Sequence, residues 1–376
     1  ESALQIDVRR LMEDLPSILF LAVIGLLIST AAVGYAMAWA SGIGIVACLL
    51  LGAIVSATDP VAGVAIFKEL GAPKRLGMLV EGESLFNDAT AIVLFTILAA
   101  MLASGGEADL TSGALDFVRV FLGGIIVGYI IARLFCLIFA QLRRMPLVEI
   151  TLTINLAFLS FILAEHYLHV SGVMSVMTSA LVLGSTGRTS ISPATWHALS
   201  ETWEQIGFWF NSLIFVLVGM AVPGILLGVG PHEAWLIALL IGVAFTARAV
   251  IIFGLLPLMK IMRLAESVSL SCQTVMVWGG LRGAVSLALA LAVIENDAFD
   301  ASTRNFIGIL VTSFVLFTLF VNATTVGMVM RLFGLDALSP TDVAVRNRAL
   351  ALSLADISEQ VLATAKVDQA DSGDQA

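Results

Sequence analysis

The chain has 376 residues, of which 59% are hydrophobic and only 12% are charged, and its formal net charge is −9. Soluble globular proteins carry about 25% charged residues, so this composition excludes an ordinary soluble domain and predicts an integral membrane protein. The acidic balance gives no reason to expect a nucleic-acid partner. No nucleotide-binding loop or Ser/His/Asp nucleophile pattern is present, so the sequence does not predict an enzyme or a bound cofactor.

Crossing the hydrocarbon core of a bilayer takes about 20 apolar residues in a helix. Continuous hydrophobic runs of this length recur along the whole chain, which predicts an all-α polytopic membrane protein in contact with the lipid bilayer. The run at 171–187 is the shortest. We predict ten spans, near residues 15–40, 43–67, 77–103, 115–141, 147–168, 171–187, 202–224, 234–258, 267–294 and 304–333.

The basic residues between these spans predict an orientation. If the N-terminus is cytoplasmic, the external loops carry only Arg304, and all the other loop lysines and arginines face the cytoplasm. The N-terminus of this chain and the tail after Gly334 are therefore predicted to be cytoplasmic. The cytoplasmic set is Arg9, Arg10, Lys68, Lys74, Arg75, Arg143, Arg144, Arg188, Lys260, Arg263 and Arg331.

Two of the predicted spans are interrupted. Thr58-Asp59-Pro60 breaks the second, because proline removes an amide donor and disfavours helix in the residue before it. Three glycines around Arg282, at 279–283, break the ninth. Each is the middle span of a set of three, and the two sets start on opposite sides of the membrane. Broken helices in corresponding positions of two inverted repeats point to a transporter site near the bilayer midplane.

Four polar residues of the third span predict an ion site beside the first break. Ser84 and Asp88 lie four residues apart on one helical face, and Glu83 and Asn87 lie on the adjacent face. Carboxylate, hydroxyl and carbonyl oxygens suit a hard monovalent cation such as sodium. Removal from water disfavours the charged form of a carboxylate, so a proton and a cation can compete for Asp88.

Two arginines stand within predicted spans. Arg248, near the centre of the eighth, needs a carboxylate partner, and we assign Glu83 to it. Arg282 lies at the second break, where its charge can cancel a helix-end charge opposite Asp59. The alternative is that these charged residues form only fold-holding ion pairs, because a buried pair can be wholly structural; it applies to Asp88, Asp59, Glu83, Arg248 and Arg282.

Three segments carry a family likeness: Ser-Ala-Thr-Asp-Pro-Val-Ala at 56–62, Glu-Gly-Glu-Ser-Leu-Phe-Asn-Asp-Ala-Thr-Ala-Ile-Val at 81–93, and Gly-Gly-Leu-Arg-Gly-Ala-Val-Ser-Leu-Ala-Leu-Ala at 279–290. In order and spacing they resemble the monovalent cation:proton antiporters, specifically the sodium/proton exchanger branch with NhaP-like bacterial proteins and plant salt-tolerance exchangers. The likeness covers about residues 1–335.

The resemblance implies roles for the matching positions. Asp88 is then the carboxylate that binds the cation or the proton, helped by Ser84, Glu83 and the main chain of Thr58. Sodium is expected at Asp88, Ser84 and Thr58. The asparagine at 87, before the key aspartate, goes with electroneutral exchange in such proteins. Two further matches place Asp59 at the first helix break and pair Arg248 with Glu83.

The resemblance also implies an architecture. A core of residues 1–103 and 233–335 moves elevator-like against a scaffold at 142–232, with 104–141 as a linking span and 336–376 as a cytoplasmic tail. Homodimers form through the scaffold. Family members usually have about thirteen spans, so three spans are expected upstream of this chain, whose first residues match the end of the third family span.

The sequence thus predicts a secondary antiporter that exchanges Na⁺ (or Li⁺) for H⁺, in the plasma membrane, with pH homeostasis and salt tolerance as its physiological setting. Potassium/proton exchange stays open, because oxygen ligands alone do not fix ion size. So does a pH or cation sensor, or a channel, built on a transporter scaffold.

Overall fold

The structure is a computed structural model, and the residues it describes form helices and contain no strand. They are residues 2–59, 74–105, 110–142, 145–187, 191, 193–226, 229–262 and 268–335, with 348, 351 and 353.

The helices follow one another along the chain with short connections, and η denotes a π-helical turn. The first half contains α1 (Ser2–Gln5), α2 (Val8–Leu19), η1 (Phe20–Gly25), α3 (Leu26–Ser41), α4 (Ile45–Ser56), α6 (Lys74–Ala103), α7 (Leu110–Gln141), α8 (Pro146–Ile162) and η2 (Leu163–Tyr167). The second half contains α9 (Gly172–Val182), η3 (Leu183–Gly187), α11 (Pro193–Leu226), α12 (Pro231–Ile261), α13 (Leu270–Trp278), α14 (Ala284–Ile294), α15 (Ala301–Phe317), η4 (Thr318–Asn322) and α16 (Ala323–Leu332).

Among the described residues, seven helical segments are long and apolar enough to cross a bilayer, and each overlaps one predicted span. The remaining three predicted spans contain the shorter apolar helices Ile45–Ser56, Gly172–Gly187 and Ala284–Ile294. Two of these belong to the spans predicted to be interrupted, and the third to the shortest run. The all-α membrane architecture is therefore confirmed. The total of ten spans stays a prediction, because 60–73 lies outside the described residues, as does the tail at 336–376 apart from three positions.

Local sequence signals set several helix ends. The Asp7 carboxylate accepts hydrogen bonds from two backbone amides in the first turn of α2. Gly42, with φ of 71°, ends α3 in the left-handed conformation that glycine adopts without strain. Pro146 and Pro231 start α8 and α12, where a missing amide donor costs nothing.

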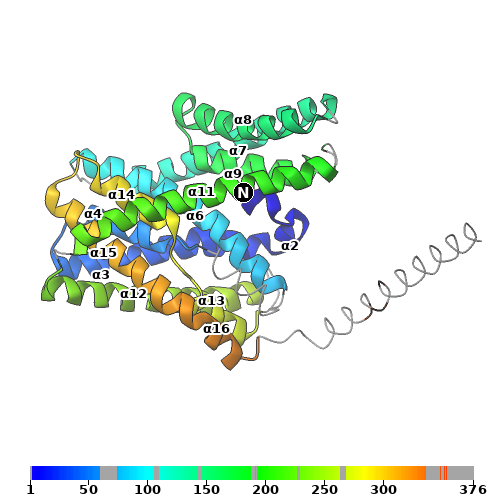
Figure 1. Cartoon of the computed structure of the whole chain (residues 1–376). Coiled ribbons are helices and arrows are strands. Elements are labelled where there is room, and N and C mark those ends of the chain that lie inside the picture. The colour runs from blue at the N-terminus through cyan, green and yellow to red at the C-terminus, as the bar shows by residue number, and fades with distance from the viewer. Residues whose placement is uncertain are drawn as a thin grey trace, which may run out of the picture.

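The helices pack in two groups (Figure 1). α3 packs against α4 and α12, α4 packs against α6, and α15 contacts α4, α12 and α14. In the other group, α9 packs against α7 and α8, and its apolar cluster includes Phe139, Leu156 and Leu199. The groups meet where α6 contacts α7 and α9, and where α11 contacts α14 and α15.

Candidate functional site

The two interrupted segments lie against each other. α4 ends at Ser56, and the chain continues extended through Thr58 and Asp59. α13 ends at Trp278 and α14 begins at Ala284. Between them, the Asp59 amide donates a 2.8 Å hydrogen bond to the carbonyl of Leu281 as an isolated antiparallel bridge. Segments more than 200 residues apart in sequence therefore cross at their breaks, roughly as the inverted-repeat pattern predicts.

α6 supplies the polar side chains next to the first break. The Ser84 hydroxyl donates to the carbonyl oxygen of Thr58, and Asn87 Nδ2 donates to Thr58 Oγ1 at 3.4 Å. All three side chains are buried. Thr58 lies two residues after the end of α4, and its carbonyl oxygen and the Ser84 hydroxyl each have a lone pair beyond this hydrogen bond to offer a ligand.

Asp88 follows one turn after Ser84 on α6 and is half-buried. Its Oδ1 atom is fully buried and has no hydrogen-bond partner among the described residues. Asp59 lies within electrostatic range of it. A buried carboxylate oxygen without a partner is costly, and binding a proton or a cation relieves that cost.

The space at the crossing is small, and both polar and apolar residues line it. A cavity of about 10 Å³ is lined by Thr58, Asp59, Glu83, Ser84 and residues of the second break. This volume corresponds to about one water molecule. The crossing thus offers room for a single small ion or water and excludes a larger solute.

Glu83 and Arg248 form the buried ion pair expected from the sequence. Arg248 donates from its two terminal nitrogens to the two carboxylate oxygens of Glu83, one of these bonds measuring 3.0 Å. The guanidinium also donates, at 3.4 Å, to the carbonyl of Met276 near the end of α13. The Glu83 charge is therefore largely neutralised by a partner on α12.

Arg282 has main-chain partners where the sequence suggested an ion pair. Its Nε donates at 2.9 Å to the carbonyl of Val55, in the last turn of α4, and a terminal nitrogen donates to the carbonyl of Gly280. No carboxylate pairs with it among the described residues. The unpaired carbonyls at a helix C-terminus carry partial negative charge, and the positive guanidinium offsets this charge as it would offset that of a carboxylate partner.

The Asp59 carboxylate lies against Gly283, which caps the N-terminus of α14. A Cβ atom on Gly283 would overlap Asp59, so only glycine allows this close approach. Asp59 thereby places negative charge at the positive end of α14.

Two residues of η4 that were not identified from the sequence form hydrogen bonds to the main chain of the second break. The Asn322 Nδ2 donates at 2.9 Å to the carbonyl of Trp278, and the Thr318 hydroxyl accepts from the Arg282 amide at 3.4 Å. Both side chains are fully buried. The sequence signal for Asn322 was a side-chain amide inside an apolar span, because polar groups at membrane depth often have a functional role.

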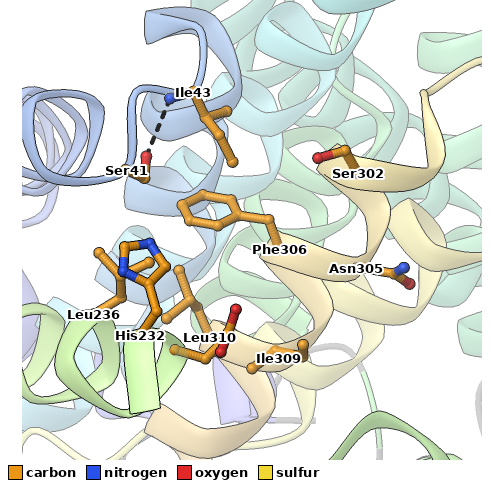
Figure 2. A pocket seen from close by; sticks show the side chains of 10 residues that line it. Ser41, Ile43, His232, Leu236, Ser302, Asn305, Phe306, Ile309 and Leu310 are labelled. Carbon is orange, nitrogen blue, oxygen red and sulfur yellow. Dashed lines mark hydrogen bonds between the residues drawn. The ribbon is translucent and has the colours of Figure 1, made fainter. Parts of the chain in front are cut away.

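A larger cavity, of about 270 Å³, lies elsewhere in the molecule. Figure 2 shows it between the end of α3 and the first turns of α12 and α15, with the Phe306 ring between Ile43 and His232. None of the predicted site residues is among the described residues that line it. It is a separate pocket from the crossing.

The described residues contain no group of three or more His, Cys, Asp or Glu side chains suited to a metal ion. The oxygens at the crossing are instead the Ser84 hydroxyl, the Thr58 carbonyl and the carboxylates of Asp59 and Glu83, with Asp88 one turn further along α6. Such hard oxygen ligands suit a monovalent cation better than a transition metal.

Comparison with known proteins agrees with this geometry. The family model described as "Sodium/hydrogen exchanger, transmembrane" matches residues 1–332. The Na(+)/H(+) antiporter ApNhaP of Aphanothece halophytica is 36% identical over 89% of this chain and 63% of its own length. The low-affinity Na(+)/H(+) antiporter NhaS1 of Synechocystis is 37% identical over 89% and 62%.

Sodium/hydrogen exchanger 7 of Arabidopsis thaliana is 34% identical over 90% of this chain and 30% of its own length, so the chain spans less than two thirds of each of these relatives. Among solved structures, the sodium proton antiporter MjNhaP1 of Methanocaldococcus jannaschii has a TM-score of 0.75 at 20% identity, over 89% of this chain and 82% of that one. The fold is therefore shared with that protein. With the family model matched from residue 1 to 332, the chain belongs to the transmembrane sodium/hydrogen exchanger family.

Proposed function

We propose that this protein is a secondary antiporter that exchanges Na⁺ or Li⁺ for H⁺, with Asp88 binding either the cation or the proton. The observation that carries the proposal is the buried Oδ1 of Asp88, which has no hydrogen-bond partner among the described residues and lies one helical turn from a hydroxyl that contacts the Thr58 carbonyl. Cation ligands on this proposal are Asp88, Ser84 and Thr58. The names of the curated relatives point to the same pair of substrates.

The other charged groups at the crossing support a single exchangeable site. Glu83 is held by Arg248, Asp59 lies at the N-terminus of α14, and Arg282 donates to carbonyls of the broken helices. Asn87 is a neutral amide that bonds Thr58. We infer that one carboxylate changes its charge per transport cycle, which makes the exchange electroneutral, with one proton per cation.

Movement is proposed to follow the two packing groups. The first, mainly within 1–103 and 233–335, carries the crossing; the second combines α7, the predicted linking span, with helices of the 142–232 scaffold. In an elevator mechanism the first group slides along the second, and the surface where α6 contacts α7 and α9 is the sliding surface. A bare Asp88 carboxylate is costly to move through a low-dielectric barrier, which prevents uncoupled transit.

Assembly and placement are proposed from the exposed apolar surface and the loop charges. The large apolar residues exposed on α11, among them Phe208, Trp209 and Phe210, suit lipid or a second copy of the chain. We propose a homodimer through the scaffold and a plasma-membrane location. The predicted orientation, with both ends of this chain cytoplasmic, rests on loop charges.

The proposal is tested with the full-length protein in proteoliposomes that contain a pH-sensitive dye. An inward Na⁺ gradient is expected to drive proton efflux that is unaffected by clamping the membrane potential. Asp88→Asn is expected to abolish this flux, because the amide cannot exchange a proton for a cation. Parallel runs with Li⁺ and K⁺ decide between sodium and potassium exchange.

Two results contradict the proposal. Cation current that follows the membrane potential without moving protons indicates a channel. Cation binding without any flux, in correctly inserted protein, indicates a sensor. Ser160→Ala, a buried change in α8 away from the crossing, is the matched control for protein handling.

A further inference from the structure

Two buried polar atoms beside the candidate site lack hydrogen-bond partners among the described residues. Arg248 is only 9% exposed; Glu83 and the Met276 carbonyl accept from its terminal nitrogens, and Nε is left without an acceptor. Asn87 is 2% exposed; its Nδ2 donates to Thr58, and Oδ1 receives no donor. One atom is a donor and the other an acceptor. Leaving both unmet costs the desolvation free energy of each.

Arg248 and Asn87 line one small cavity. Its other polar lining residues are Ser29, Ser56 and Arg282, and the remaining walls are apolar. The volume is about 10 Å³, close to that of a single water-sized sphere. A cavity of this size, lined by one residue with an unmet donor and another with an unmet acceptor, has the properties of a buried-water site and not of a dry void.

We propose that this cavity binds one water molecule, which accepts a hydrogen bond from Arg248 Nε and donates one to Asn87 Oδ1. The serines complete its shell. Ser56 Oγ donates to Ser29 Oγ at 2.9 Å, which leaves the Ser29 hydroxyl proton and a lone pair of Ser56 for the water. The water then accepts two bonds and donates two, within the usual range for buried waters.

The π-helical turn η1 forms part of the cavity wall through Leu21 and Gly25. A π-turn inserts one residue into a helix and recurs at functional sites. A Cβ atom on Gly25 would come within 3.0 Å of Ile251 Cγ2, so glycine lets the first span approach α12 closely here. The wide turn and the glycine together shape a pocket next to the polar atoms.

The water links the Glu83–Arg248 ion pair to Asn87 and fixes the Asn87 amide with its oxygen toward Arg248 and its nitrogen toward Thr58. Thr58 supplies the carbonyl of the candidate cation site. We therefore assign Ser29 and Ser56 as positioning residues that act through the water on cation affinity. This consequence rests on the proposed exchange function; the presence of the water does not.

The water is tested directly by electron cryomicroscopy of the full-length protein in lipid nanodiscs, at a resolution of about 2 Å, where buried waters are visible. A density peak within hydrogen-bond distance of both Arg248 Nε and Asn87 Oδ1 supports the site. An empty cavity, with both side chains well resolved, overturns it. This outcome does not depend on transport, so it separates failure of the water site from failure of the proposed function.

The positioning role is tested by Na⁺-dependent proton flux in proteoliposomes. Ser29→Ala is expected to raise the apparent KM for Na⁺ about three- to tenfold, the effect of one lost hydrogen bond, with the maximal rate nearly unchanged. In the Asn87→Ala background it should cause little further rise, because the two act through one water. Ser160→Ala, the same change at another buried serine, should leave KM unchanged. An unchanged KM in Ser29→Ala, or fully additive effects, overturns the role.

Discussion

The two interrupted segments differ in charge, and each charge lies against the other broken helix. The first break carries an acid, Asp59, whose carboxylate lies at the N-terminal cap of α14. The second carries a base, Arg282, which donates to the Val55 carbonyl in the last turn of α4. The acidic Asp59 thus lies at the positive end of α14, and the basic Arg282 lies at the negative end of α4. Neither break is electrostatically complete without the other, so the crossing is a single unit.

The two breaks also differ in the elements that form hydrogen bonds with them. Ser84 and Asn87 of α6 bond the first break, and the same helix carries Asp88. Asn322 and Thr318 of η4 bond the second break, and neither of these residues is a carboxylate. The paired breaks thus share an architecture, but among the described residues only the first has a carboxylate, Asp88, on the helix that contacts it. We infer that the first side governs ion affinity and the second mainly governs stability.

The largest effect is expected at the ion pair that connects the two sides. Glu83→Gln leaves the buried Arg248 charge without its carboxylate, which should lower the free energy of unfolding by about 3 to 5 kcal/mol. The double change Glu83→Gln and Arg248→Met should recover part of that loss, because no uncompensated charge remains. Thermal denaturation followed by size-exclusion chromatography measures both. Equal stability of the single variant and the wild type would contradict a paired, desolvated Arg248.

A smaller effect is expected from the charges of the breaks themselves. Arg282→Met leaves the Val55 and Gly280 carbonyls without their donor, a loss of about 2 to 3 kcal/mol for hydrogen bonds to a charged group. Asp59→Asn keeps the side-chain shape and removes the helix-end charge, worth about 0.3 to 1 kcal/mol. The same denaturation assay ranks the two. A larger loss of unfolding free energy in Asp59→Asn than in Arg282→Met would contradict the assignment of Asp59 to a helix-end charge and of Arg282 to buried hydrogen bonds.

The smallest effect sharpens the contrast between affinity and stability. Asn322→Ala removes the donor to the Trp278 carbonyl and should cost about 1 kcal/mol of stability. Its apparent KM for Na⁺ should stay near the wild-type value. Ser84→Ala, on the first side, should raise KM and change stability less. A KM that rises equally in both variants would show that the second break also binds the ion.

Sequence reasoning located the breaks because they are local: proline and glycine interrupt apolar runs at 58–60 and 279–283. It also paired Glu83 with Arg248, since a buried charge needs a partner and few were available. The carbonyl partners of Arg282 and the contact of Asn322 with Trp278 were not predictable in the same way. They depend on the relative register of distant helices and on π-helical turns, which hydrophobic periodicity does not reveal.

The central claim is that one carboxylate binds either a proton or a sodium ion. It is tested most directly by adding Na⁺ to weakly buffered, detergent-solubilised full-length protein and measuring proton release. The account predicts release approaching about one proton per chain when Asp88 starts protonated, and none in Asp88→Asn. Na⁺ binding without proton release, or release that persists in Asp88→Asn, would contradict it.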